Sequence, residues 1–116
     1  MDLNDYAVQC HEDNINWWLD PKTKHPIERN FGELIALCHS ELSEALEGHR
    51  KNLMDDKLPH RKMVEVELVD CLIRIFDLAG AYSMNLEDAY QEKRAFNKNR
   101  ADHKHENRLA EGGKKY

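Results

Sequence analysis

The segment of residues 60–82 restricts the fold of this chain more than any other feature. On a helical wheel of roughly 100° per residue, apolar side chains surround nearly its whole circumference. A helix that is apolar on all sides belongs in the middle of a helical assembly. One polar stripe nevertheless occupies about a quarter turn of the wheel, and it consists of Glu67, Asp70, Arg74 and Asp77. Buried charges are unfavourable unless they are paired or bound to metal, so this stripe is the first candidate for a functional site.

Three further segments carry helical periodicity, residues 3–19, 27–49 and 86–104. Asp2 and Asn85 are suitable caps for the first and last of them, and Pro21 stops the first. The sequence contains no alternating β pattern, internal repeat or low-complexity segment. We therefore expect an all-α, four-helix bundle-type protomer over residues 1–104, followed by a polar tail over residues 105–116.

The charge balance narrows the range of partners. The 116 residues include 17 Lys and Arg against 22 Asp and Glu, which gives a net charge of −5. Such a chain is not expected to bind nucleic acid or a membrane surface, because both require a basic face. A small anionic substrate remains compatible if metal ions or a local basic patch meet it. Because so short a chain buries only a modest core, we expect a homo-oligomer.

The cysteines and the lack of targeting signals indicate a cytoplasmic protein. Cys10, Cys38 and Cys71 form no CxxC motif and lie beside apolar neighbours, so they are interpreted as reduced packing residues. Neither a signal peptide nor a run of the ~20 apolar residues that span a membrane is visible.

The segment of residues 27–49 adds two acids to the polar stripe. Glu41 falls inside its apolar arc, and Glu44 lies at the edge of that arc, one turn further along. A Glu-x-x-Glu on one core helix would then face the Glu-x-x-Asp of Glu67 and Asp70 on another. Four such acids cannot all stay ionised without cations between them, and oxygen ligands without His or Cys select Mg²⁺, with Mn²⁺ as a possible substitute. The alternative is that Arg74 and nearby lysines neutralise the acids as structural ion pairs.

The last helical segment contributes a basic stripe. Lys93, Asn97 and Arg100 are spaced by four and three residues and share the core-facing side of that segment. They are candidates for contacting the phosphates of a metal-bound ligand. They are equally compatible with a surface stripe paired with neighbouring glutamates. Asp77 is expected to orient Lys93 or Arg100, or else to bind a further ion.

Two adjacent tryptophans close the first helical segment. Trp17 and Trp18 point in different directions on a helix, so both cannot easily enter one core. Core packing is the ordinary role of each. The other interpretation is that one of them stacks on a nucleobase while Asn14 binds the edge of that base.

The order of these motifs resembles the MazG-like all-α nucleoside triphosphate pyrophosphohydrolases, especially their short single-domain and phage-encoded members. The resemblance covers about residues 31–100. It rests on His39-Ser-Glu41-Leu-Ser-Glu44-Ala-Leu-Glu47, on Glu67-Leu-Val-Asp70-Cys-Leu-Ile-Arg74-Ile-Phe-Asp77-Leu-Ala79 and on Lys93-Arg-Ala-Phe-Asn97-Lys-Asn-Arg100. The sequence departs from such proteins after Arg100, where Ala101 replaces a proline and Gly112-Gly113-Lys114 follows only after an insertion.

The resemblance implies a dimer or a dimer of dimers that hydrolyses a nucleoside triphosphate to monophosphate and pyrophosphate. It implies that Glu41, Glu44, Glu67 and Asp70 hold Mg²⁺, and that Lys93, Asn97 and Arg100 contact phosphate or sugar. Glu41 and Glu44 are the expected catalytic acids, with Glu44 holding the attacking water. A purine (deoxy)nucleotide such as dGTP is the working substrate, in the cytoplasm of the cell or of the phage host. The alternatives are a dUTP-type pyrophosphatase, a nucleotide- or metal-binding helical module without turnover, and a purely structural bundle.

Overall fold

The computed structural model describes residues 1–100, which fold entirely into helices and loops. The helices are α1 (Leu3–Asp13), the short 3₁₀ helix η1 (Ile15–Trp18), α2 (Phe31–Arg50), α3 (Met63–Ala81) and α4 (Leu86–Asn99). Within residues 1–100 there is no strand, only the isolated bridges Leu19–Pro26 and Met54–Lys62, each of which closes a loop. The all-α fold class is therefore confirmed. None of the helices in this described part is long and apolar enough to cross a membrane.

Side-chain caps fix where three of the helices begin. The Asp2 carboxylate accepts a hydrogen bond from the Asp5 backbone N–H at 2.9 Å, and Asp5 returns one to Asp2, which completes a capping box. Asn30 caps α2, and Asn85 caps α4 as predicted. Such caps satisfy backbone donors that have no partner inside the first turn.

The predicted helix 3–19 is wrong in its second half. The α-helix ends at Asp13 because the Asn14 side chain turns back and donates a hydrogen bond to the Cys10 carbonyl at 2.8 Å. The chain then continues as the 3₁₀ turn η1. The other predicted helices, 27–49 and 60–82, begin three or four residues early and differ by one residue at their ends. The fourth was predicted to continue to residue 104; α4 ends at Asn99, and residues 101–116 lie outside the described part.

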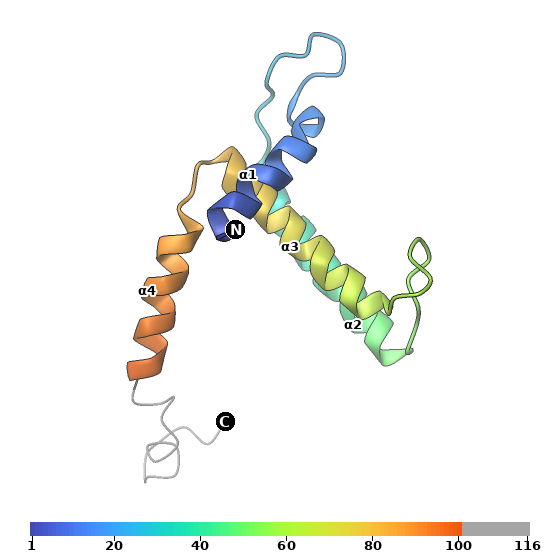
Figure 1. The fold of residues 1–116 in the computed structure, drawn as a ribbon. Coiled ribbons are helices and arrows are strands. Elements are labelled where there is room, and N and C mark those ends of the chain that lie inside the picture. Colours follow the sequence, from blue (N-terminus) through green and yellow to red (C-terminus); the bar gives the residue numbers. More distant parts are fainter. Residues whose placement is uncertain (101–116) are drawn as a thin grey trace. The chain divides into compact units, whose positions relative to one another are not determined.

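Residues 1–84 form the first of two compact units. In this unit α2 and α3 run side by side over their length as an antiparallel pair, and α1 packs on α3 (Figure 1). Gly80 of α3 makes the contact between α1 and α3 possible. A Cβ atom placed on Gly80 would lie 2.5 Å from the Ala7 carbonyl oxygen, so only glycine lets α1 approach this closely.

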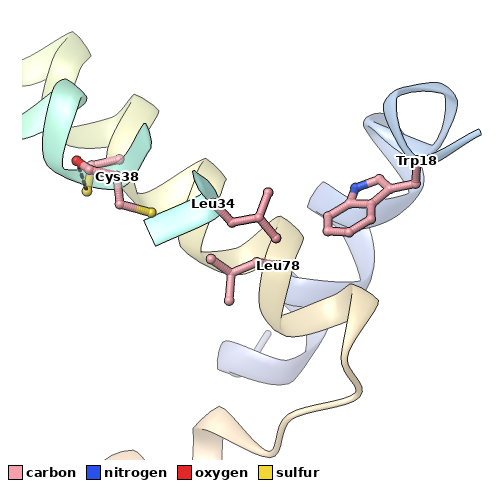
Figure 2. Close-up of a cluster of buried hydrophobic side chains, with 5 residues drawn as sticks. Trp18, Leu34, Cys38 and Leu78 are labelled. Carbon is pink, nitrogen blue, oxygen red and sulfur yellow. Dashed lines mark hydrogen bonds between the residues drawn. The ribbon is translucent and has the colours of Figure 1, made fainter. Parts of the chain in front are cut away.

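The core of this unit is small. Trp18 from η1 faces Leu34 of α2 and Leu78 of α3 (Figure 2), and buried cysteines continue the core along the α2–α3 pair. Cys38, Cys71 and the half-buried Cys10 are all free thiols, in agreement with the sequence. Many large apolar side chains of α2 and α3 stay exposed, so α3 is less enclosed by its own chain than its composition predicts.

The second unit begins at Asn85 and contains α4. No residue of α4 is buried, and Tyr90 and Phe96 are 50% and 59% exposed. The Lys93 ammonium lies 4.8 Å from the centre of the Phe96 ring, a cation–π contact within one face of the helix.

Candidate metal centre

Three of the four predicted metal ligands converge between α2 and α3. Carboxylate oxygens of Glu41, Glu67 and Asp70, called here the acid cluster, all lie within 4.8 Å of one another. Glu41 is only 8% exposed, which agrees with its position in the apolar arc of its helix. Glu44 lies one turn further along α2, is exposed, and lines the same groove. The spacing of three residues in each motif places each pair on one side of its helix, and the antiparallel packing brings the pairs together.

The carboxylates of the acid cluster disfavour the ionisation of Glu67. Burial, together with the neighbouring Glu41 and Glu44, raises the pKa of Glu67 to about 8. Glu67 Oε2 is buried, and no hydrogen-bond donor in residues 1–100 reaches it. Ionised carboxylates cannot donate to each other, so Glu67 satisfies this atom only by carrying a proton or by meeting a cation.

Arg74 provides part of the missing positive charge. Its Nε donates to Glu41 Oε1 at 3.0 Å. Burial alone would raise the pKa of Glu41, but hydrogen bonds from Glu67 and Arg74 outweigh burial and hold that pKa below its usual range. The pKa of Asp70 is raised, first by burial and then by Glu41 and Asp55. Arg74 pairs directly with Glu41 and lowers the pKa of Asp70 only against the larger effect of burial. A structural ion pair therefore accounts for Glu41, and a bound proton or a cation accounts for Glu67.

The acid cluster lies in the middle of a groove of about 1050 Å³. Asn14 and Trp17 form one end of this groove, and the α2–α3 loop, residues 53–58, forms the other. Leu34, Leu37 and Leu78 add apolar surface near the Trp17 end. A groove of this size can hold a small molecule, and its many charged side chains distinguish it from a mostly apolar ligand pocket.

The two tryptophans have different roles. Trp18 is 8% exposed, belongs to the core, and donates from Nε1 to Asp77 Oδ1 at 2.9 Å, so it is a packing residue and not part of the groove. Trp17 is 37% exposed and lines the groove, and the Arg29 guanidinium stacks over its ring at 4.1 Å from the centre. Arg29 also donates to the Trp17 carbonyl oxygen. Of the two tryptophans, Trp17 is therefore the one that a ligand in the groove can reach.

Asp77 orients residues other than those predicted. Its Oδ1 accepts hydrogen bonds from His11 Nδ1 and Trp18 Nε1, both at 2.9 Å. Asp77 therefore ties α1 and η1 to α3, where the sequence predicted that it would orient Lys93 or Arg100. Asp77 also lines the groove, as Trp17 and the other residues of the polar stripe do.

The predicted phosphate contacts lie in the second unit. Lys93 and Asn97 share one shallow pocket on α4 with Tyr90, Arg94 and Lys98. Arg100 follows the helix as its C-cap, and its backbone N–H donates to the Asn97 carbonyl at 3.4 Å. The prediction that Lys93, Asn97 and Arg100 share a face is compatible with this helix, and their contact with a ligand stays a prediction.

Two residues of the groove were not expected from the sequence. Asp55 and Lys57 lie in the α2–α3 loop and line the groove, and, after burial and the charge of Glu41, the charge of Asp55 helps to raise the pKa of Asp70. Their only sequence signal is the polar run Asp55-Asp56-Lys57 in a predicted loop, and such runs are common on protein surfaces.

Comparison with known proteins adds no identification. No family model, no curated protein and no solved structure matches this chain.

Proposed function

We propose that this chain is a Mg²⁺-dependent nucleoside triphosphate pyrophosphohydrolase, which releases monophosphate and pyrophosphate. The observation that carries the proposal is the acid cluster, three carboxylate oxygens within 4.8 Å with a buried Glu67 oxygen that lacks a donor in residues 1–100. An all-carboxylate set of ligands suits Mg²⁺ or Mn²⁺. The resemblance of the motifs to MazG-like enzymes supplies the reaction, and the exposed Trp17 in the same groove supplies a surface for a base.

Different residues of the groove are assigned to metal binding and to activation of the attacking water. Glu41, Glu67 and Asp70 would hold the metal, with Arg74 keeping Glu41 ionised and in place. A bound Mg²⁺ neutralises triphosphate charge and polarises the phosphorus under attack. Glu44 is exposed to solvent in the groove, and we assign it to orient the attacking water and accept its proton.

The nucleoside part of the substrate is assigned to the other end of the groove. Trp17 offers an aromatic face, and Asn14 offers a carboxamide whose Nδ2 already donates to the Cys10 carbonyl, which leaves its oxygen to accept from a base. A purine (deoxy)nucleotide such as dGTP has the larger stacking area and is the substrate we expect. Lys93, Asn97 and Arg100 remain assigned to phosphate or sugar, and the cytoplasm is the compartment where this substrate pool occurs.

The test is a screen for pyrophosphate release over all ribo- and deoxynucleoside triphosphates, with and without Mg²⁺. We expect Mg²⁺-dependent release of pyrophosphate and not of orthophosphate. Glu41→Gln should retain the helical circular dichroism spectrum and lose at least ~100-fold in rate, the usual effect of removing a group that acts in the transition state. Glu33→Gln is the matched control, because Glu33 is exposed on the same helix and does not line the groove.

Two results would redirect this proposal. Tight binding of a triphosphate without turnover over hours would indicate a binding module. Activity confined to dUTP would indicate a dUTP-type pyrophosphatase. A panel of triphosphates that stays intact, with none bound, refutes the proposal.

An exposed apolar stripe on α2 and α3 supports the expected association of copies. The stripe is formed by Ile35, Leu42, Leu46, Leu68, Val69 and Leu72, which are 38–58% exposed. On each helix it lies on the side away from the groove. Leu42 and Glu44 on α2, like Val69 and Glu67 on α3, are two residues apart and differ by about 160–200° in direction. Exposed apolar side chains gathered on one side of a helix mark a candidate interaction surface. We propose that it pairs two copies of the chain and leaves both grooves open.

A further inference from the structure

The groove has an unequal balance of charge. Among residues 1–100, seven carboxylates and two cationic side chains, Arg74 and Lys57, line it. Arg74 is engaged by Glu41 at 3.0 Å. Within residues 1–100, no ion pair of the Lys57 ammonium is present. Of the groove cations in the described part of the chain, Lys57 is therefore the one that remains available to an anionic ligand.

The loop that carries Lys57 is a defined structure. Asp55 is only 6% exposed, and its Oδ2 accepts hydrogen bonds from the backbone N–H groups of Lys57 and Leu58 at 3.0 and 2.8 Å. The Asp55 backbone N–H donates to the Arg61 carbonyl at 2.9 Å. The bridge between Met54 and Lys62 closes the loop at its base. Asp55 thus fixes the backbone from which the Lys57 side chain extends.

The two ends of the groove lie at different distances from the acid cluster. The loop joins α3 at Met63, which is one helical turn, about 6 Å, from Glu67. Asp77, which holds the tryptophan end, is about 10 Å beyond Asp70 in the opposite direction at ~1.5 Å per residue. The near end carries a cation, and the far end carries an exposed aromatic ring.

We propose that Lys57 binds the terminal phosphates of a nucleoside triphosphate, with Asp55 as its positioning residue. The nucleotide then lies along the groove with its base on Trp17 and its phosphate tail at the loop of residues 53–58. This inference rests on the proposed function, and it deepens that function by giving the substrate a direction in the site. The longer part of the groove, between the acid cluster and Trp17, accommodates the nucleoside. The shorter part, between the acid cluster and Lys57, accommodates the two phosphates that leave as pyrophosphate.

Binding of inorganic tripolyphosphate, measured by calorimetry with Mg²⁺ present, tests Lys57 without any turnover. Lys57→Gln should weaken this binding about tenfold, the usual effect of losing one charge-assisted hydrogen bond, and Lys57→Arg should restore most of it. Lys62→Gln is the matched control. Lys62 is the N-cap residue of α3, just beyond this loop, its Nζ donates to Asn52 Oδ1 at 2.9 Å, and it does not line the groove.

Two further measurements test the positioning role and the direction. Asp55→Ala should weaken tripolyphosphate binding as Lys57→Gln does, and Asp55→Asn should restore it because the amide oxygen can accept the same backbone hydrogen bonds. Trp17→Ala should weaken binding of a nucleoside monophosphate and leave tripolyphosphate binding unchanged, and Lys57→Gln should do the reverse.

The outcomes separate this inference from the proposed function. Wild-type tripolyphosphate affinity in Lys57→Gln overturns the inference, and the proposed function stands if pyrophosphate is still released. Binding that depends on Lys57 without hydrolysis supports the inference and refutes the proposed reaction. A wild-type protein that binds neither tripolyphosphate nor a triphosphate refutes both.

Discussion

Replacing Glu67 by glutamine should make the metal-free protein more stable, by an amount that depends on pH. The folded protein holds Glu67 at a pKa of about 8, against 4.5 for a free side chain, because of its burial and its neighbours Glu41 and Glu44. Each pKa unit corresponds to ~1.4 kcal/mol, so the full difference has a ceiling of about 5 kcal/mol. Glu67 keeps some contact with solvent, and we therefore expect a gain of ~2 kcal/mol in the free energy of unfolding.

The direction of the pH effect follows from which state holds the proton. Below pH ~4.5 both states are protonated, and wild type and Glu67→Gln should differ little. Between pH 4.5 and about 8 the unfolded chain releases the proton while the folded protein keeps it, so wild-type stability falls as pH rises. Above about pH 8 both states are ionised, and the difference becomes constant. Glutamine does not titrate, so the advantage of the variant should grow from pH 5 to 8 and then level off.

The assay is urea unfolding in EDTA at a series of pH values from 5 to 9, at one fixed protein concentration because association affects apparent stability. Glu65→Gln is the control, since Glu65 is exposed on the same helix and does not line the groove. Addition of Mg²⁺ at pH 8 should raise the midpoint of wild type and not that of Glu67→Gln. An advantage of the variant that is equal at pH 5 and pH 8.5, or absent at both, refutes this account of the acid cluster.

Three further predictions concern packing and association. Gly80→Ala should lower the free energy of unfolding by ~1–3 kcal/mol, because the new Cβ meets the rigid Ala7 carbonyl at 2.5 Å, and urea unfolding measures it. A melting temperature equal to that of wild type would contradict this contact. Asp77→Leu should lower the free energy of unfolding by ~2–3 kcal/mol, because the buried Trp18 indole N–H loses its acceptor. The tryptophan fluorescence should shift only slightly to the blue, and the thermal transition should broaden. An unchanged free energy of unfolding would count against this role. Leu72→Lys places a charge in the apolar stripe and should shift sedimentation from an oligomer toward a monomer, with unchanged sedimentation as the opposing result.

Much of the candidate site followed from helical spacing alone. The burial of Glu41 and the shared direction of Glu67 and Asp70 follow from the positions of these acids among apolar residues of the same helix. Such patterns are local, and the 3.6-residue period converts them directly into faces. The roles of these acids in binding metal and in catalysis remain predictions that the proposed assays address.

Contacts of two kinds were not predicted from the sequence: hydrogen bonds between distant parts of the chain, and hydrogen bonds from a side chain to the backbone of its own helix. Asn14 ends α1 through one hydrogen bond to Cys10, although the apolar pattern continues to Leu19. Asp77 was predicted to orient Lys93 or Arg100, or else to bind a further ion, and the sequence did not indicate its contacts with His11 and Trp18, 66 and 59 residues away. Periodicity contains no information on which of these groups will meet.

The sequence by itself determined that residues 1–100 are all-helical, where the first and last helices begin, and that two pairs of acids share helix faces with apolar residues. These properties depend on backbone hydrogen bonds, caps and side-chain direction within a few residues. The tertiary structure decided that Trp18 packs in the core while Trp17 lines the groove, and that Asp55 and Lys57 close its other end. It also decided that one arginine serves a cluster of three acids. The packing of α2 against α3 determines which faces meet, and burial in that contact gives Glu67 its raised pKa.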